Sequence, residues 1–400
     1  MDNKKNGIPK LRFPGFTGAW EQRRLGEVAE INPSSEIPDN FEYVDLESVV
    51  GTEMIAYRRE NKKTAPSRAQ RLAKKGDIFY QTVRPYQKNN YHFNLTQKNF
   101  VFSTGYAQLR PNINGDFLFV YIQLNNFVNE VLNRSTGTSY PAISPSNLIR
   151  MKVAIPTNNE QKKIGTFFKQ LDSLITLHHR KLEHLKEQKK GLLQKMFPKN
   201  GEVVPEVRFP GFTDDWEQRK ITELGKIYIG LVTTMTEHYV NKGTLLIRNS
   251  DIKEGKFEFG ENPIFLDESF SEKNKSRMHQ IGDVITVHTG DIGTSAVITE
   301  REANSIGFAT IVTRPKKEVI SSQYLCTFLN TEQHKKWALS VSTGDGRNNY
   351  NLKDYYRLRV PTPSIEEQQC ISDFVGNLDT LITLHQRKVK YLISTLVVYL

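Results

Sequence analysis

The sequence contains one residue pattern with the spacing of a known hydrolytic site. Pro38-Asp39 is followed by Glu60-Asn61-Lys62, and two carboxylates beside a lysine can hold Mg²⁺ for the cleavage of DNA. The pattern has no equivalent later in the chain, and such loose matches arise by chance where charged residues make up 25% of the sequence. An autonomous Mg-dependent nuclease that uses Asp39, Glu60 and Lys62 is therefore kept as an alternative.

Other catalytic motifs are missing from the sequence. There is no G-x-x-x-x-G-K-[ST] loop for a nucleoside triphosphate, and Gly344-Asp345-Gly346 is an isolated G-x-G. The Asn/Asp-Pro-Pro-aromatic tetrapeptide of amino-methyltransferases is absent as well. Cys326 and Cys370 lack the spacing of metal ligands, and the histidines are scattered. We therefore expect no catalytic residues, no metal site and no disulfide framework.

Polar, basic and aromatic residues instead gather in segments that leave predicted strands. Arg and Lys can bond to guanine edges in DNA, and Asn and Gln can bond to adenine. An ordinary polar loop is the alternative for each residue, because loops are polar in any case. The candidate DNA contacts are Gln81, Thr82, Arg84, Tyr86, Lys88, Asn89, Asn90, Thr138, Ser139 and Tyr140, then Arg248, Asn249, His288, Thr289, Asp291, Thr294, Ser295, Arg347, Asn348, Asn349 and Tyr350.

The net charge of +11 favours a polyanionic partner, either nucleic acid or an acidic membrane surface. The first residues, MDNKKNG, are polar, and no apolar run approaches the roughly 20 residues that cross a bilayer. The uncharged segment YLISTLVVYL at residues 391–400 is too short for an anchor. We expect a cytoplasmic protein.

The chain is a tandem repeat. The segment PKLRFPGFTGAWEQRRLGE begins at residue 9, and PEVRFPGFTDDWEQRK begins at residue 205. Trp20 and Trp216 in these segments are expected to be packing anchors. Further landmarks also recur, since Ser135-Thr136-Gly137 returns as Ser342-Thr343-Gly344, yet the segments between them differ. A duplicated scaffold with two unlike loop sets predicts two different targets of one chemical kind.

Each repeat reads as a cluster of short strands followed by a helix, which is typical of a compact mixed α/β domain. The predicted strands are 41–50, 77–83, 99–104 and 106–111, then 244–249, 256–260, 283–289, 294–299 and 309–315. One helix is expected near 117–132 and another near 323–339, and a proline-bearing link, 153–156 or 360–363, leaves each domain.

Two long segments have the period of a coiled-coil seam, with steps of three and four residues. LDSLITLHHRK at residues 171–181 reappears as LDTLITLHQRK at 378–388. A narrow apolar stripe cannot be buried by one helix alone, so we expect an antiparallel intramolecular pair, in which His178 and His385 set the register. The predicted seam consists of Ile164, Phe168, Leu171, Ile175, His178, Leu182 and Leu185, and of Ile371, Val375, Leu378, Ile382, His385, Val389 and Leu392.

The combination of LRFPGF…WEQR, FSTGYAQLRP and LD-x-LI-x-LH-x-RK resembles the specificity subunit of type I restriction-modification systems, over nearly the whole chain. The resemblance implies two target-recognition domains that each read half of a bipartite sequence in double-stranded DNA. It also implies helices that act as a ruler and dock two methyltransferase subunits, through which restriction subunits join. The subunit of this family is not an enzyme and binds no cofactor, because S-adenosylmethionine, ATP and Mg belong to its partners.

The expected fold is therefore a mixed α/β protein with two target-recognition domains in a pseudo-two-fold repeat, separated by two long antiparallel helices. The expected boundaries are 1–155 and 199–362 for the domains, with the helices at 156–198 and 363–400. The second helix ends as VKYLISTLVVYL and lacks the LLQKMF closure of the first, so a shortened spacer is expected. A coiled-coil scaffold that does not bind DNA is the other alternative.

Overall fold

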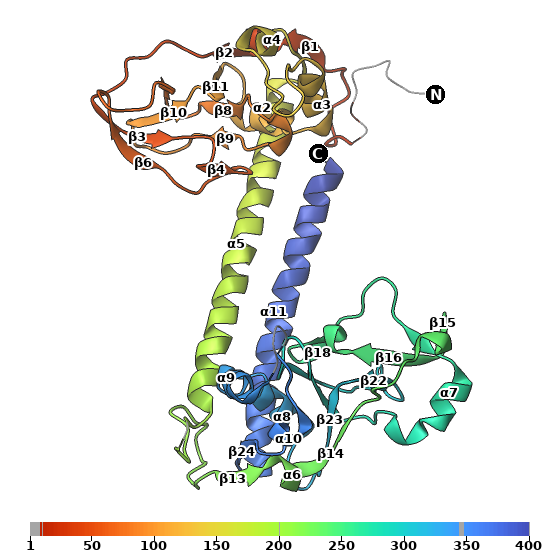
Figure 1. Cartoon of the computed structure of the whole chain (residues 1–400). Helices are drawn as coiled ribbons and strands as arrows, with labels where there is room; N and C mark the ends of the chain where they lie inside the picture. The colour runs from red at the N-terminus through yellow and green to blue at the C-terminus, as the bar shows by residue number, and fades with distance from the viewer. Residues whose placement is uncertain (1–8, 10, 200, 344–347, 400) are drawn as a thin grey trace. The chain divides into compact units, whose positions relative to one another are not determined.

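The computed structural model describes residues 9, 11–199, 201–343 and 348–399, with side chains up to residue 395. The chain forms two compact units (Figure 1). Unit 1 contains residues 1–179 and 387–400, and unit 2 contains residues 180–386. Each unit therefore includes part of both long helices.

The described part of unit 1 contains two four-stranded sheets and two small strand pairs. One sheet has the order β2-β11-β8-β9, from Ala29–Ile31, Tyr106–Pro111, Ile78–Gln81 and Tyr91–His92. The other has the order β6-β3-β10-β7, from Arg58–Asn61, Asn40–Val44, Phe100–Ser103 and Ala69–Leu72, with β3 and β10 parallel. Strands β4 (Val49–Val50) and β5 (Glu53–Met54) form a hairpin.

Buried aromatic side chains hold unit 1 together. Every residue of β8 is buried, and Phe79 stacks on Phe102 of the second sheet with ring centroids 3.6 Å apart. On the other side of β8, Tyr80 packs against Phe127. The helices of unit 1 are α1 (Leu25–Val28), α2 (Gly115–Tyr121), α3 (Asn125–Asn133) and α4 (Pro145–Ile149), with a 3₁₀ turn η1 at Pro85–Gln87.

Unit 2 repeats this plan with different proportions. Its first sheet has the order β14-β23-β20-β21, from Gly225–Ile229, Ile311–Pro315, Val284–Thr286 and Ser295–Val297. Its second has the order β15-β19-β16-β22, from Tyr239–Val240, Phe265–Leu266, Thr244–Arg248 and Ile306–Phe308. Strands β17 (Ile252–Lys253) and β18 (Lys256–Phe257) form a hairpin. The helices are α6 (Ile221–Leu224), α7 (Glu268–Lys273), α8 (Ser322–Leu329), α9 (Glu332–Val341) and α10 (Leu352–Tyr355), with 3₁₀ turns η2 (Thr236–His238), η3 (Asn249–Asp251) and η4 (Lys275–Arg277).

The structure confirms the mixed α/β class and corrects several elements. The proline-bearing links are strands, since β12 (Lys152–Ile155) and β24 (Arg359–Thr362) pair with β1 (Glu21–Arg24) and β13 (Glu217–Lys220). Each predicted single helix is a pair of helices, α2 with α3 and α8 with α9. In the second pair, the Thr331 hydroxyl accepts from the His334 N–H and so begins a new helix.

The long helices are α5 (Asn158–Met196) and α11 (Ile365–Tyr399). Every predicted seam residue is buried or half-buried, whereas most residues between them are exposed. Within unit 2, Lys189 bonds to Asp379, and Leu192 and Met196 join a core with Ile371. Lys189 of α5 lies beside Asp379 of α11, whereas Met196, later on α5, shares a core with Ile371, earlier on α11. The two helices therefore run antiparallel. The register role of His178 and His385 stays a prediction, and no helix in the described part of the chain is long and apolar enough to span a bilayer.

A buried ion pair fastens the repeated R-F-P-G-F segment to the start of each long helix. In unit 1, Nε and Nη2 of Arg12 bond to the two oxygens of Glu160 at 2.7 and 2.8 Å. In unit 2, Nε and Nη2 of Arg208 bond to Glu367 at 2.7 and 2.9 Å, and Trp216 Nε1 donates to the same carboxylate. The side chains of Glu160 and Glu367 are 0% and 1% exposed. Such forked pairs are strong and fix an orientation.

Removal of one arginine from these pairs should destabilise its unit. We expect Arg208→Ala to lower the free energy of unfolding by about 3 kcal/mol, because it strips the fork from a buried carboxylate. Arg219→Ala is the matched control, since Arg219 pairs with Glu217 on the surface and its loss should cost less than about 1 kcal/mol. Denaturant titrations of the full chain measure both changes, and equal effects would contradict the assigned role.

Candidate nucleic-acid interface

Both units bring their two predicted loops together at one end of a central strand. In unit 1, residues 82–90 follow β8 and contact the segment after Ser135-Thr136-Gly137, through backbone bridges from Val83 and Thr136 to Ala142. In unit 2, residues 287–294 follow β20, and Thr289 and Thr343 form the equivalent bridges to Asn349. The strand ends therefore place segments that are distant in sequence on one edge of each unit.

Arg84 and Tyr140 form the centre of the exposed surface in unit 1. The Arg84 guanidinium lies over the Tyr140 ring, 4.2 Å from its centroid, and the Arg84 N–H donates to the Pro141 carbonyl. This contact pairs the cation with the ring face. Tyr140 is 61% exposed and Tyr86 is 49% exposed, and Thr138 and Ser139 are exposed beside them. The surface thus presents one cation, two phenol rings and two hydroxyls.

Several other predicted contacts in unit 1 point into the protein. Gln81, Thr82 and Asn90 are buried, and the Thr82 hydroxyl donates to the Gly105 carbonyl. In this structure these side chains hold the loop, and their role as DNA contacts stays a prediction. Polarity alone does not distinguish a loop side chain that faces solvent from one that holds the loop.

Lys88 and Asn89 are half-buried and also serve the loop. Lys88 Nζ donates to the Gln123 carbonyl and to Asn125 Oδ1, and burial lowers the pKa of this ammonium group. The Asn89 amide oxygen accepts from the Gly51 N–H. Both side chains are therefore engaged within unit 1.

The predicted residues near Thr289 that the structure describes in unit 2 form a mostly neutral surface. The Thr289 hydroxyl donates to Asn349 Oδ1 at 2.9 Å, and His288 Nδ1 lies 2.8 Å from the same hydroxyl. Burial lowers the pKa of His288, which keeps the ring neutral near pH 7. Asp291 and Asn348 are exposed. The polar groups available here are hydroxyl, amide and carboxylate, in contrast to the cation and phenols of unit 1.

The remaining candidates of unit 2 have other surroundings. Arg248 forms a forked pair with Asp251, and Asn249 Oδ1 accepts from the His288 N–H. Thr294 and Ser295 are buried. Tyr350 is fully buried in the core, where its hydroxyl lies 3.2 Å from His334 Nε2, and its role as a DNA contact stays a prediction. Arg347 lies outside the described residues.

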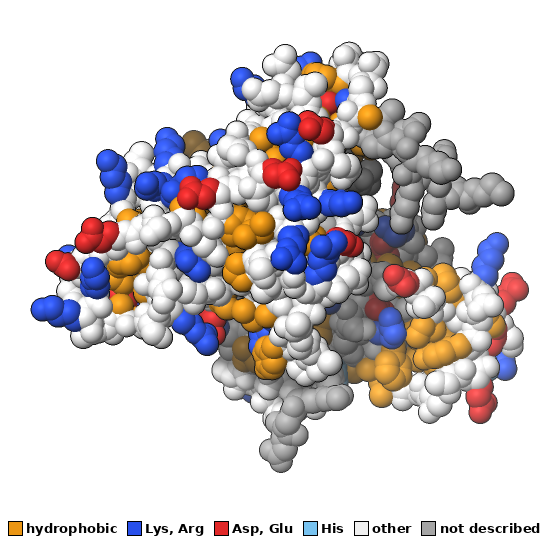
Figure 2. All heavy atoms as spheres, turned by 90° about the horizontal axis from the view of Figure 1, so that it is seen from above, with side chains coloured by type: hydrophobic (Ala, Val, Ile, Leu, Met, Phe, Trp, Pro, Cys, Tyr) orange, Lys and Arg blue, Asp and Glu red, His pale blue; other side chains and the backbone are white. Residues whose placement is uncertain are grey.

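The nuclease-like triplet lies at the paired strands β3 and β6. Glu60 pairs with Arg58 at 2.8 Å, while the Lys62 backbone N–H donates to the Asp39 carbonyl. Within residues 11–199, 201–343 and 348–395, no group of three or more His, Cys, Asp or Glu side chains is arranged to hold a metal ion. Figure 2 shows Lys and Arg side chains spread over the nearest face of unit 1, with acidic and apolar side chains between them.

Two residues that hold these loops were missed by the sequence reasoning. Gln123 contacts Lys88 and Asn90, and Asn330 contacts Ser295. Both lie in the short turn between two helices, at positions separated by the same number of residues as Ser135 and Ser342. That shared spacing was the available signal.

Comparisons with known proteins converge on one family. The family model "Type I restriction modification DNA specificity domain" matches residues 18–187 and 213–393. The type I restriction enzyme MjaVIII specificity subunit of Methanocaldococcus jannaschii is 23% identical over 310 residues, which covers 74% of this chain and 71% of the relative.

Two solved structures are similar in fold. The first is a chain from work on complex assembly and conformational transition of the type I R-M system, with 21% identity and a TM-score of 0.57, and the match covers 97% of this chain and 96% of that one. The second is the type I restriction-modification system S subunit from M. genitalium, with 14% identity and a TM-score of 0.56, covering 98% and 96%.

Proposed function

Because the chain belongs to the family of type I restriction modification DNA specificity domains, we propose that it selects the DNA target of a type I restriction-modification complex. Its target is an asymmetric sequence with two half-sites separated by a gap. One observation supports this most directly, namely that two copies of one scaffold carry unlike polar surfaces at the same strand end. Different side chains at equivalent positions would select different bases.

The chain acts as a recognition subunit and not as an enzyme in this proposal. Arg84 and its neighbours would contact one half-site, and Thr289, Asp291 and Asn348 would contact the other. Surface Lys and Arg would neutralise phosphates, which contributes affinity but no sequence information. S-adenosylmethionine, ATP and Mg would be used by the partner subunits.

The long helices would dock two methyltransferase subunits, through which restriction subunits join. The repeated LITLH segments leave two leucines exposed in each unit, Leu174 and Leu177 at 45% and 47%, and Leu381 and Leu384 at 45% and 47%. In unit 1, Leu174 lines an apolar pocket of about 450 Å³ with Tyr391 and Leu392. Exposed apolar groups in such a patch favour a protein partner.

Methylation mapping tests the proposed target. The chain is co-expressed with its methyltransferase subunit, and methylated adenines are located across the genome. We expect one motif with two unlike half-sites and a fixed gap, because the loop surfaces of the two units differ. A continuous or palindromic motif would contradict the proposal, and purified complex without salt-dependent DNA binding would favour a scaffold role.

Arg84→Ala should relax recognition at one half-site only, because the guanidinium lies in one unit. We expect discrimination against a wrong base at that half-site to fall by roughly 5- to 100-fold. Arg23→Ala is the matched control, since Arg23 is exposed in the same unit but pairs with Glu21 on β1. Competition binding with altered duplexes measures both, and equal weakening at both half-sites would identify Arg84 as a phosphate contact or a structural residue.

The helix pair should determine the gap between half-sites. Insertion of one heptad into both α5 and α11 preserves both seams and adds roughly 10 Å to each helix. We expect the methylated motif to keep both half-site sequences and to gain a longer gap. Insertion into α5 alone is the control, because it shifts one seam against the other and should reduce methylation. An unchanged gap in the double insertion would argue against the spacer role.

A further inference from the structure

The proposed reading loops each return to an edge strand. Residues 82–90 lead to β9 and residues 287–294 lead to β21, and both strands are the last in their sheets. The outer backbone groups of an edge strand have no neighbouring strand to bond with. Buried groups of this kind need another partner, because an unpaired buried N–H or carbonyl is costly. The side chain that supplies this partner therefore holds the end of the loop.

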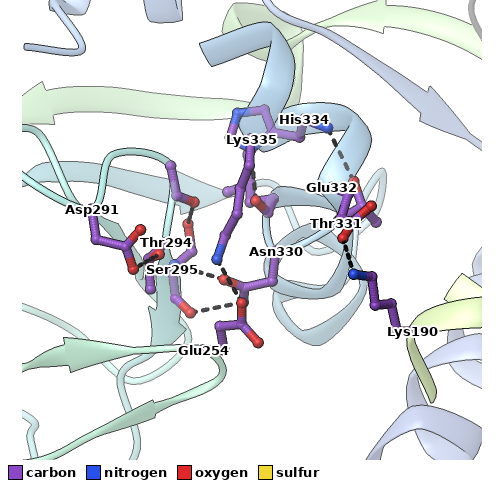
Figure 3. A network of polar contacts seen from close by, with 12 residues as sticks. Lys190, Glu254, Asp291, Thr294, Ser295, Asn330, Thr331, Glu332, His334 and Lys335 are labelled. Atoms are coloured by element: carbon purple, nitrogen blue, oxygen red, sulfur yellow. Dashed lines mark hydrogen bonds and ion pairs between the residues drawn. The ribbon is translucent and has the colours of Figure 1, made fainter. Parts of the chain in front are cut away.

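Asn330 supplies both bonds in unit 2. It lies between α8 and α9, and its Oδ1 accepts from the Ser295 N–H at 3.0 Å. Its Nδ2 donates to the Ser295 carbonyl at 2.9 Å (Figure 3). Ser295 is the first residue of β21 and is 0% exposed. The amide thus substitutes for a neighbouring strand at the point where the loop ends.

The bonds around Ser295 extend into the loop. Its hydroxyl lies 2.8 Å from the Thr286 hydroxyl at the end of β20, so both ends of the loop are joined. The Val287 N–H donates to the Thr294 carbonyl, and the Thr294 hydroxyl donates to Asp291. A shift of Ser295 would therefore move Asp291, which lies on the proposed reading surface.

The turn that carries Asn330 is itself anchored in unit 2. Glu332, at the start of α9, bonds to Lys190 and Gln194 of α5 at 2.6 and 2.8 Å. Lys335, one turn later, pairs with Glu254. Figure 3 shows this network between α5, the helix turn and the loop. Asn330 is thus a fixed point on the frame of the unit and not part of a mobile loop.

Gln123 occupies the equivalent position in unit 1, between α2 and α3. Its Oε1 accepts from Asn90 Nδ2 at 3.2 Å, and Asn90 Oδ1 accepts from the Gln81 N–H at 2.7 Å. Asn90 immediately precedes β9, so this amide chain continues the pairing of β8 and β9 beyond its end. The backbone carbonyl of Gln123 also accepts from Lys88 Nζ at 2.6 Å. Gln123 and Asn90 are 7% and 1% exposed.

Resting on the proposed function, we propose that Gln123 and Asn330 are equivalent positioning residues that determine base specificity without touching DNA. The amide of each residue holds the returning end of the reading loop in its own unit, that of Gln123 through Asn90 and that of Asn330 directly through Ser295. The pair accounts for why the same turn carries an amide in both repeats although the loops differ. Each residue acts only on the half-site that its own unit reads.

Two single substitutions test the proposal in the full complex. Asn330→Ala and Gln123→Ala chains are each co-expressed with the methyltransferase subunit, and the methylated motifs are mapped. We expect each variant to relax one half-site, and the two variants to relax different half-sites. Discrimination against wrong bases at the affected half-site should fall about tenfold, since the loop loses the amide bonds that fix its shape. Those bonds join Gln123 to Asn90 and Asn330 to Ser295, whereas the bond from Lys88 to the Gln123 backbone carbonyl remains. The other half-site should stay within about twofold of the parent chain.

Controls separate positioning from a general loss of structure. Asn274→Ala is the matched variant in unit 2, because the Asn274 amide donates to the Phe270 carbonyl of its own helix at 2.8 Å. It should leave both half-sites unchanged. Where Asn330→Ala does not fold, Asn330→Asp keeps the shape of the side chain and the acceptor for the Ser295 N–H, but it replaces the nitrogen that donates to the Ser295 and Cys326 carbonyls with an oxygen. It should relax the same half-site.

The possible failures are distinguishable. A parent chain that gives no interrupted motif would overturn the proposed function itself. A parent chain with an interrupted motif, together with folded variants that leave both half-sites unchanged, would overturn only the positioning role. Relaxation of both half-sites by either variant, or of the same half-site by both variants, would also overturn it.

Discussion

The narrow apolar stripe on each long helix is the constraint on which the structure depends. Its residues recur at steps of three and four, so they cover too little of the helix surface to pack into an ordinary core. The apolar stripes of α5 and α11 bury each other, and the two helices run in opposite directions. As a consequence, residues 387–400 complete unit 1 although they follow unit 2 in the sequence. Unit 1 is therefore discontinuous in the sequence, whereas unit 2, residues 180–386, is one continuous segment.

Buried carboxylates then attach each α/β unit to the start of its helix. Glu160 and Glu367 are ionisable groups without solvent, so each needs its arginine, and the fork allows one orientation. A second forked pair is also repeated, between Asp77 and Arg110 and between Asp283 and Arg314, inside the two sheets. Such contacts tolerate little change, which explains why the frames of the repeats match while their loops do not.

The sequence predicted the frame well, because periodicity reports burial directly. An apolar side chain at a seam position loses free energy if it faces solvent, so the apolar pattern marks the buried positions. Every predicted seam residue is buried or half-buried. The split of each predicted helix was missed, since Ile122 and Leu124 continue an apolar pattern through the break in unit 1. The strands β1 and β13 were also missed, because their residues are polar and largely exposed. Their pairing with β12 and β24 depends on tertiary contacts.

The loops were predicted less well, for a different physical reason. Arg84 and Lys88 are both basic and both adopt a left-handed backbone conformation, with φ of 54° and 55°. Arg84 packs on an exposed ring, whereas Lys88 turns inward to a helix end. Tyr140 and Tyr350 follow equivalent landmarks, yet one is 61% exposed and the other is fully buried. Residue type does not encode these directions, because neighbouring elements decide them.

A loop whose ends are hydrogen-bonded to the folded unit can change its sequence at the tip without loss of the fold. In unit 1 the support is a chain of amides from Gln123 through Asn90 to the end of β8, and an ammonium group adds to it. In unit 2 a single amide bonds the strand directly, and ion pairs to α5 fix the turn that carries it. The place of support is the same and its chemistry is not. Two surfaces on one frame can therefore diverge independently, since a change in one loop needs compensation only within its own unit.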